Sequence, residues 1–347
     1  MRAGTVVRRL RLATGLVLFA YLVTHYANHA LGLVSLAAME AGRRWFAWLW
    51  DGWPGGLLLG GALTLHLVLA LWALYVRRSL GGMRRWEAGQ LLLGLAVPPL
   101  LAIHLLGTKV AALLFGTDPL YAYLLLVLWV YSPWIGLQQA VLVLVAWCHG
   151  CLGLHFWLRI RPWYGRVRLL LFSVALLLPV LALLGFAEAG REVARLNLDP
   201  AWRDQAAAAI HFPTADQVAL VYRLQAWCLW GFGALVAAVL AARLVRDRLV
   251  RRAAIVVAYP DGRKVEVPRG TTILEASRIG GIPHASVCGG RGRCSTCRVR
   301  IAAGLAHLPP VSPEERRVLD RVGAPPNVRL ASRIEVPRWI STLRSSG

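Results

Sequence analysis

Lysine and acidic residues are scarce in this 347-residue sequence. Lysine occurs only as Lys109 and Lys264, and 17 acidic residues stand against 39 basic ones, which leaves a net charge of +22. So large a positive charge is usual in proteins that bind nucleic acid. Here the arginines instead form short clusters between long apolar runs, which is the pattern of loops between membrane spans. We therefore expect no nucleic-acid partner.

The sequence also lacks the regular cysteine spacing of a secreted, disulfide-bonded domain. Of the six cysteines, Cys148, Cys151 and Cys228 lie in apolar runs, and the other three lie within ten residues of one another. The first apolar run has no clear small-residue cleavage site and is followed by further apolar runs. We therefore expect a retained helix there and not a signal peptide.

Long apolar runs make up most of the first 245 residues. Hydrophobic residues account for 57% of the chain and the mean hydropathy is +0.55, whereas a soluble domain has about 45–50% apolar residues. A membrane span needs roughly 20 such residues. We expect a polytopic all-α bundle with six spans in the lipid bilayer, at 12–35, 56–76, 89–115, 135–158, 168–187 and 218–242. The apolar stretch 120–132 is expected to form a short re-entrant or interfacial helix.

The arginine clusters predict the orientation of this bundle. They lie at the N-terminus, in 77–87, in 159–168 and directly after the sixth span, all on one side of a six-span arrangement. The segments on the other side, 37–55, 107–134 and 188–217, are balanced or acidic. By the positive-inside rule both termini face the cytoplasm, and the chain is a multi-pass protein of the cell membrane.

From residue 254 onward the pattern changes to that of a small soluble domain. After a membrane domain over 1–245 and a basic linker over 246–253, we expect a compact α+β domain over 254–340. AIVVAYPDGRKVEVPRG predicts two strands around a turn, and TTILEASRIGG predicts a short helix that ends at two glycines. CRVRIAAG and NVRLAS predict further strands. Between them, SPEERRVLD begins with a capping box formed by Ser312 and Glu315.

A glycine-rich loop in this domain carries Cys288, Cys294 and Cys297 at C-x5-C-x2-C spacing. Plant-type ferredoxins bind an iron–sulfur cluster with C-x4-C-x2-C and a distant fourth cysteine. Glycines let a backbone wrap closely around a cluster and point its amide N–H groups at the sulfurs. A zinc site or three unrelated thiols are the alternatives, but zinc usually takes four ligands in paired spacing.

Residues 254–334 resemble [2Fe-2S] ferredoxin domains in the stretches GTTILEAS, GIPHASVCGGRGRCSTCRVRI and NVRLAS. The resemblance implies a β-grasp fold and a [2Fe-2S] cluster held by Cys288, Cys294, Cys297 and a fourth cysteine after the Leu-Ala pair. That position is Ser332 here, and no cysteine follows Cys297. A serine oxygen binds iron, but it is harder and far less acidic than a thiol, so we expect a more labile cluster of lower potential. A frameshift just before Ser332 is the alternative explanation.

Histidines recur inside four of the predicted spans: His25 and His29 on the first, His66 on the second, His104 on the third and His149 on the fourth. Ionisable residues inside a bilayer are costly and point to function, and histidine is the usual axial ligand of haem. At 1.5 Å per residue, two of them lie roughly 15 Å from the cytoplasmic face and three lie roughly 20–26 Å from it. We expect two b haems, one between His66 and His149 and one between the first and third spans. Hydrogen bonding between helices, or a proton path, is the alternative.

Over nearly its full length the chain resembles the N-terminal part of bacterial membrane-anchored class III adenylate cyclases. The matching stretches include RLATGLVLFAYLVTHYANHALGL, AMEAGRRWFAWLW, HGCLGLHFWLRIRPWY and LLPVLALLGFAEAGREV. In that family a six-helix b-haem domain, similar to succinate dehydrogenase membrane anchors, precedes a [2Fe-2S] domain and a cyclase domain. The cyclase domain is not in this sequence, so we expect no cyclic AMP synthesis by this chain alone.

Three functions follow from these expectations. The first is electron transfer between a quinone in the bacterial inner membrane and the cytoplasmic iron–sulfur centre. The second is redox sensing for an adenylate cyclase domain or another redox partner. The third is a membrane scaffold without cofactors. A homodimer is a further expected partnership.

Overall fold

The computed structural model describes residues 2–77, 80, 83, 85–251, 254–259 and 261–336. The chain forms two compact units. The first, called here the helical unit, comprises Met1–Ala73, Arg85–His155 and Gly165–Ala238. The second, called here the C-terminal unit, comprises Leu74–Arg84, Phe156–Tyr164 and Val239–Gly347.

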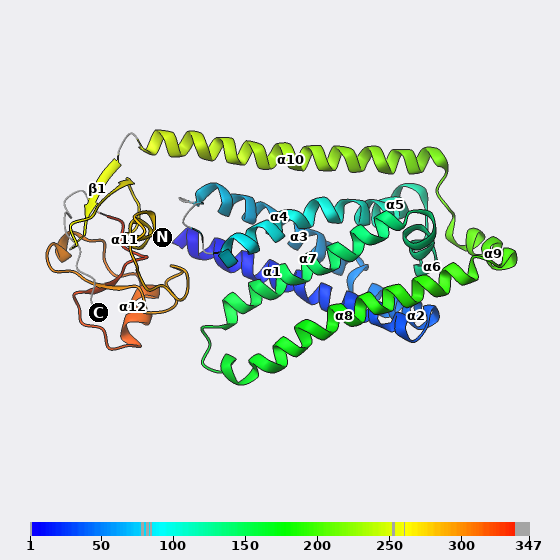
Figure 1. Ribbon diagram of the computed structural model, residues 1–347, viewed down its shortest axis with the longest axis horizontal. Coiled ribbons are helices and arrows are strands. Elements are labelled where there is room, and N and C mark those ends of the chain that lie inside the picture. Colours follow the sequence, from blue (N-terminus) through cyan, green and yellow to red (C-terminus); the bar gives the residue numbers. More distant parts are fainter. Residues whose placement is uncertain are drawn as a thin grey trace. The chain divides into compact units, whose positions relative to one another are not determined.

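Long helices dominate the chain up to residue 251 (Figure 1). They are α1 (Arg2–Ala30), α2 (Leu36–Trp50), α3 (Trp53–Val76), α4 (Arg85–Leu105), α5 (Ala111–Phe115), α6 (Tyr121–Leu125), α7 (Pro133–Leu158), α8 (Tyr164–Leu196), α9 (Pro200–Ile210) and α10 (Ala215–Arg251). A 3-10 turn, η1 (Leu31–Leu33), follows α1, and π-helical turns η2 (Leu106–Val110) and η3 (Leu126–Tyr131) follow α4 and α6. The expected short helix over 120–132 is therefore confirmed. The segment 246–251, predicted as linker, is helical because α10 continues through it.

By length and composition, five helices of the described chain can cross a membrane: α3, α4 with its continuation to Phe115, α7, α8, and α10 as far as Leu249. The multi-pass character predicted from the sequence is confirmed, and five of the six predicted spans are among these helices. The sixth candidate, α1, is 29 residues long, which is ample. It is less apolar because its first half carries Arg8, Arg9 and Arg11 and its second half carries His25, Asn28 and His29.

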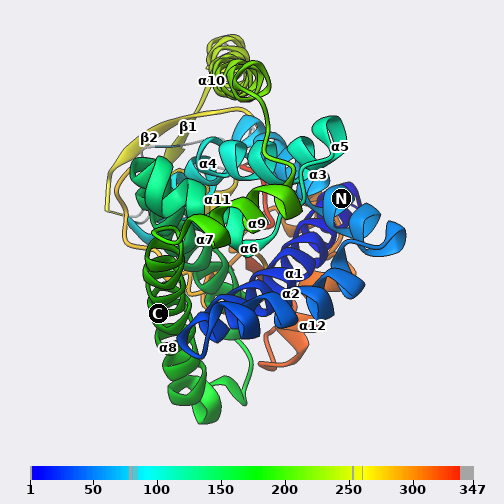
Figure 2. The same ribbon diagram turned by 90° about the vertical axis from the view of Figure 1, so that its right-hand side faces the viewer.

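Buried side chains of α1, α7 and α8, the helices labelled in Figure 2, pack together in the helical unit, and a larger cluster joins α2, α6, α8 and α9. The hydroxyl of Tyr26 donates to the carbonyl of Val143 at 2.7 Å, and the indole N–H of Trp147 donates to the carbonyl of Ala175 at 2.7 Å. Both bonds join buried aromatic side chains to the backbone of a neighbouring helix, so these polar groups are satisfied inside the bundle.

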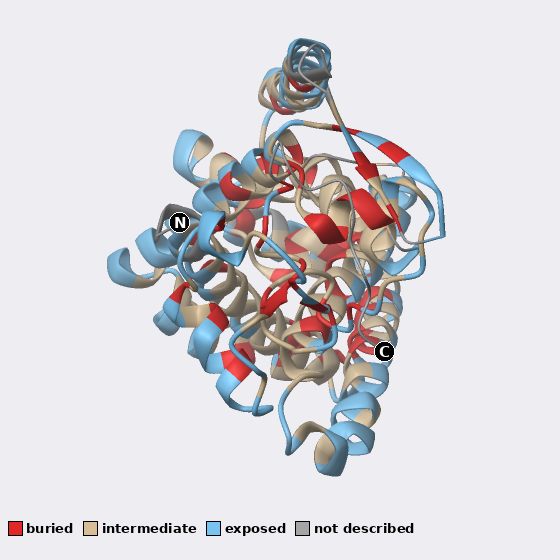
Figure 3. Cartoon of the chain, turned by 90° about the vertical axis from the view of Figure 1, so that its left-hand side faces the viewer, coloured by how far each residue is buried: buried red, intermediate tan, exposed pale blue. Residues whose placement is uncertain are grey.

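Among its described residues from 254 onward, the C-terminal unit forms four strands and two α-helices. They are β1 (Ala254–Ala258), β2 (Lys264–Pro268), α11 (Ile273–Ile279), β3 (Arg298–Arg300), α12 (Pro313–Asp320) and β4 (Val328–Leu330), with a 3-10 turn η4 (Leu305–His307). β1 pairs with β2 and β3 with β4, both antiparallel. In the described residues these are two separate two-stranded sheets, so the single β-grasp sheet is not seen. Buried residues gather between the sheets and helices (Figure 3).

A complete capping box forms at α11, where none was predicted, whereas the box predicted at α12 forms only in part. Around α11 a complete box forms, because Thr272 accepts from the Glu275 N–H and Glu275 accepts from the Thr272 N–H. At α12 Ser312 caps the helix, but the carboxylate of Glu315 turns away to Arg329 on β4, with both N···O distances 3.0 Å. The predicted box at α12 is therefore wrong in its second half, since a buried guanidinium takes the carboxylate.

This buried ion pair predicts a large stability effect. The side chains of Arg329 and Glu315 are 4% and 1% exposed. Glu315→Gln leaves the guanidinium without its counter-charge, so we expect a loss of about 3–5 kcal/mol in domain stability. Glu314→Gln, at the neighbouring position, is the control and should cost well under half as much. Urea titration of the full-length protein, followed by hydrogen exchange of the backbone amides of α12 and β4, measures both; equal effects would contradict the role of the pair.

Candidate functional site

The three loop cysteines and Ser332 lie in two pairs in the C-terminal unit. The sulfur of Cys294 accepts from the backbone N–H of Cys288 at 3.3 Å. The sulfur of Cys297 lies 3.5 Å from the hydroxyl oxygen of Ser332. Cys297 directly precedes β3 and Ser332 closely follows β4, and the two strands are paired in register. The sheet thus brings together two residues that are 35 positions apart in the sequence.

The loop surrounds the sulfur of Cys288 with hydrogen-bond donors. The Cys294 thiol and the backbone N–H groups of Arg293, Cys294 and Arg291 donate to it, and together they hold the pKa of the Cys288 thiol well below its usual range against the opposing effect of burial. The thiolate is the form of cysteine that binds metal. Backbone donors aimed at sulfur are the arrangement that was predicted from the glycine-rich loop.

Glycine is required where the loop turns. Gly289, Gly290 and Gly292 have φ angles of 71°, 85° and 63°, in the left-handed region. A Cβ on Gly292 would also lie 2.4 Å from the side-chain Nε of Arg333. The backbone can therefore fold tightly around the cysteines only with these glycines in place.

The arrangement suits a two-iron cluster better than a single zinc ion. Within the described ranges, no three His, Cys, Asp or Glu side chains are grouped as one metal ion needs. Two pairs of ligand atoms instead offer two ligands to each of two irons. Two buried cysteines, donors to sulfur and a glycine-rich loop all fit a [2Fe-2S] cluster.

Comparison with known proteins supports the same conclusion. A family model described as a 2Fe-2S iron-sulfur cluster binding domain matches residues 257–323. The 2Fe-2S ferredoxin of Escherichia coli (strain K12) is 32% identical over 90 residues, which are 23% of this chain and 81% of that protein. Through its C-terminal domain, the chain belongs to the 2Fe-2S ferredoxin family. The predicted [2Fe-2S] domain is confirmed.

The ferredoxin domain is also similar to part of larger redox proteins. One component of the Na(+)-translocating NADH-quinone reductase of Actinobacillus succinogenes is 29% identical over 123 residues, which are 32% of this chain and 30% of that protein. The same component in Neisseria gonorrhoeae is 31% identical over 100 residues, 27% of this chain and 25% of that protein. The chain thus spans less than a third of the length of these relatives.

In the helical unit the predicted site histidines come together in two groups. The ring centroids of His66 on α3 and His149 on α7 lie 6.3 Å apart. Those of His25 on α1 and His104 on α4 lie 6.0 Å apart, and His29 lies 4.5 Å from His25. These are the groupings that the depth argument predicted.

The groups that orient the rings of His66 and His149 were not predicted from the sequence. Nδ1 of His66 lies 3.1 Å from the hydroxyl of Thr14, and Nδ1 of His149 lies 3.1 Å from the carbonyl oxygen of Gln90. A Cβ on Gly94 would lie 2.7 Å from the His149 ring, so α4 approaches this ring closely only because position 94 is glycine. The polar Gln90 near the start of an apolar run was the one signal available.

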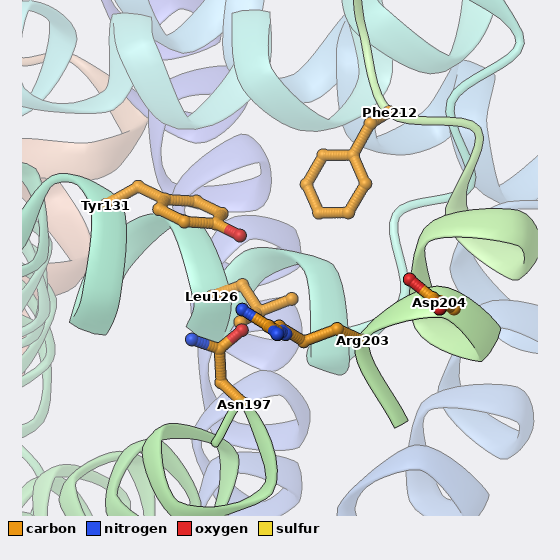
Figure 4. Close-up of a pocket in the computed structure, with 6 residues that line it drawn as sticks. All are labelled: Leu126, Tyr131, Asn197, Arg203, Asp204 and Phe212. Carbon is orange, nitrogen blue, oxygen red and sulfur yellow. The ribbon is translucent and has the colours of Figure 1, made fainter. Parts of the chain in front are cut away.

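A pocket of about 480 Å³ lies where η3, the end of α8 and α9 meet (Figure 4). It is lined by Leu126, Tyr131, Asn197, Arg203, Asp204 and Phe212. The rings of Tyr131 and Phe212 meet edge to face, with centroids 6.4 Å apart. The Oδ1 atom of Asn197 is buried and has no hydrogen-bond partner among the described residues. The pocket thus combines aromatic walls with an unused acceptor and a cation.

Proposed function

We propose that this chain is a membrane-bound electron-transfer protein that carries two b haems in its helical unit and a [2Fe-2S] cluster in its ferredoxin domain. The ferredoxin domain gives the electron-transfer chemistry. The observation that carries the haem proposal is the close approach of four histidines from four helices in two pairs.

The spacing of these pairs fits iron between them. An iron about 2 Å from one nitrogen of each of two imidazoles places the ring centroids about 6 Å apart. The distances of 6.3 Å for His66 and His149 and 6.0 Å for His25 and His104 match this requirement.

Hydrogen bonding also leaves the required atoms free. Haem-ligating histidines normally bond through Nδ1 to a carbonyl or hydroxyl, which fixes the ring and leaves Nε2 for iron. His66 and His149 have such Nδ1 partners in Thr14 and Gln90.

For the second haem we propose His25 and His104 as ligands. His29 lies one turn further along α1, and its ring meets the Tyr121 ring edge-on at 5.8 Å. Its Nδ1 is buried without a partner in the described chain. We assign His29 a place beside the porphyrin and not on its iron.

For the cluster we propose Cys288 and Cys294 as ligands of one iron, and Cys297 and Ser332 as ligands of the other. The match to the family model ends at residue 323 and so does not include Ser332. The assignment of Ser332 rests on its 3.5 Å distance from Cys297. When bound, the cluster accepts and releases single electrons.

Exchanging the serine ligand for a thiol tests this assignment. Ser332→Cys is expected to slow the loss of the cluster to a chelator on the order of tenfold and to raise its potential, because a soft thiolate holds iron better than an alkoxide. Ser332→Ala should speed the loss. The decay of visible absorption and a redox titration followed by electron paramagnetic resonance (EPR) measure both; identical behaviour of the three proteins would rule Ser332 out as a ligand.

We further propose six spans, with α1 as the first, and both termini on the cytoplasmic side of the bacterial cell membrane. The four arginine clusters then share the cytoplasmic face. Two of the polar residues in the apolar part of α1, His25 and His29, are the histidines that the haem proposal uses, so their cost in the membrane has a functional reason.

We propose that a membrane quinol is the electron donor and that it binds in the pocket of Figure 4. Aromatic walls suit a quinone ring, Asn197 Oδ1 can accept from a quinol hydroxyl and Arg203 can donate to a quinone carbonyl. The pocket lies on η3, which continues α6, and α6 begins at Tyr121 beside His29. Oxidation of the quinol releases two electrons and two protons.

Anaerobic addition of a short-chain quinol to the full-length protein in vesicles tests the proposal. Haem bands are expected to appear first, followed by the EPR signal of the reduced cluster. Asn197→Leu should raise the quinol concentration needed without changing either cofactor. A redox sensor for an adenylate cyclase would show the same reduction but would also change the activity of an added cyclase partner. No reduction of either centre would contradict electron transfer from quinol.

A further inference from the structure

A second pocket, of about 240 Å³, lies beside the cluster-binding loop within the C-terminal unit. Three arginines line it, Arg159, Arg293 and Arg321, together with the hydroxyl-bearing Thr296 and the cysteine Cys294. The residues that line it include no Asp or Glu. The pocket is therefore strongly positive and opens directly onto a residue proposed as a cluster ligand.

The positive charge of this pocket is not neutralised by the domain itself. In the part of the chain that the structure describes, neither Arg293 nor Arg321 forms an ion pair with a carboxylate. Arg159 donates to the carbonyl of Val287, and its guanidinium lies 5.1 Å above the ring of Phe156. Its Nε is buried and has no hydrogen-bond partner among the described residues. Such an unsatisfied donor in a cationic pocket points to an anionic ligand.

The pocket also lies at the most accessible of the cluster cysteines. Cys288 and Cys297 are 2% and 0% exposed, whereas Cys294 is only half-buried. The Cys294 sulfur lies 3.1 Å from the hydroxyl of Thr296, which is exposed. Electron exchange falls off steeply with distance, so a partner seated over Cys294 approaches the cluster more closely than one placed elsewhere on the domain.

We propose that this arginine pocket is the docking point where the cluster exchanges electrons with a soluble protein that presents aspartate or glutamate side chains. The proposal rests on the assembly of the cluster, as set out under the proposed function. In each encounter the reduced cluster loses one electron and the partner's centre gains it, with no bond made or broken and no proton transferred. Carboxylates of the partner would pair with the guanidinium groups and bring its redox centre to Cys294.

Two small oxidants of opposite charge can stand in for the unidentified partner. The full-length protein is reduced with dithionite, freed of excess reductant and mixed with ferricyanide or with hexaammineruthenium(III). Freeze-quench EPR then follows the cluster signal alone, without interference from haem absorption. At low ionic strength the anionic ferricyanide is expected to oxidise the cluster faster than at high ionic strength, because the pocket attracts it.

The double variant Arg293→Gln/Arg321→Gln is expected to slow ferricyanide oxidation on the order of tenfold at low salt and to remove most of its salt dependence. The rate with hexaammineruthenium(III) should stay the same or rise. Arg298→Gln/Arg300→Gln is the matched control, since both arginines are exposed on β3 and the change in net charge is identical.

The outcomes separate this proposal from the proposed function. If both double variants slow ferricyanide equally, the effect is one of net charge and the pocket is not the docking point. If the pocket variant slows both oxidants equally, the cluster itself has changed and the proposal also fails. If the unmodified protein gives no EPR signal of a reduced [2Fe-2S] cluster, the proposed function has failed, and the docking proposal with it.

Discussion

Cys297→Ala is expected to remove the [2Fe-2S] cluster completely. Cys297 is fully buried, and its carbonyl accepts from the N–H of Ala331 at 2.8 Å, so it fixes the junction between the loop and the paired strands. Its thiolate is the only sulfur in its pair, because the other member is Ser332. Without it one iron keeps only a serine oxygen from the protein, which is too weak a ligand set to hold a cluster.

The cluster loss is measured as iron and acid-labile sulfide per chain and as the EPR signal after reduction. Sulfide should fall to the background, while the haem bands of the same sample stay unchanged and show that the protein has folded. Cys228→Ala, on the exposed side of α10, is the matched control and should keep all of its sulfide. A Cys297→Ala protein with its sulfide intact would exclude this residue as a ligand.

His149→Leu is expected to remove one of the two haems, about half of the bound haem. Leucine is similar in volume to histidine and suits the membrane, so the loss of the nitrogen ligand is the main change. The matched control is His155→Leu, six residues further along α7 and not in either pair. Pyridine haemochrome analysis of the purified variants measures the haem content.

Double variants distinguish two histidines that bind the same haem from substitutions that lower haem content by destabilising the protein. Because the rings of His66 and His149 approach closely, His66→Leu/His149→Leu should lose no more haem than either single variant. His104→Leu/His149→Leu takes one ligand from each pair and should lose both haems. If each His→Leu substitution removed its own share of haem, so that the losses of the single variants added in both double variants, the proposed pairing of the haem ligands would be contradicted.

The sequence predicted the [2Fe-2S] domain and the grouping of the histidines better than it predicted the surroundings of each site. The cysteine spacing and the glycines are local signals, because most of the proposed cluster ligands lie in one loop. The depths of the histidines follow from a fixed helical rise, so the two pairs were predicted from residue numbers alone. The close approach of the two rings in each pair, at nearly perpendicular planes, appears only in the structure.

Contacts between distant segments were the ones that the sequence did not reveal. Glu315 has the local signature of a capping box, yet a buried arginine 14 positions away takes its carboxylate. Nothing in the sequence marks Thr14 and Gln90 as partners of histidines. Only the packing of the helices brings them to the rings of His66 and His149. The arginine pocket combines residues from the loop after α7 with residues of the ferredoxin domain, and no spacing rule connects them.

We propose that one chain holds both haem between its membrane helices and a two-iron cluster in its ferredoxin domain. Combined haem, iron and sulfide analysis of the purified full-length protein, with oxidised and dithionite-reduced spectra, tests it most directly. We expect two b haems, two further irons and two sulfides per chain, with b-type bands and a reduced-cluster EPR signal. Colourless protein without bound iron would contradict it.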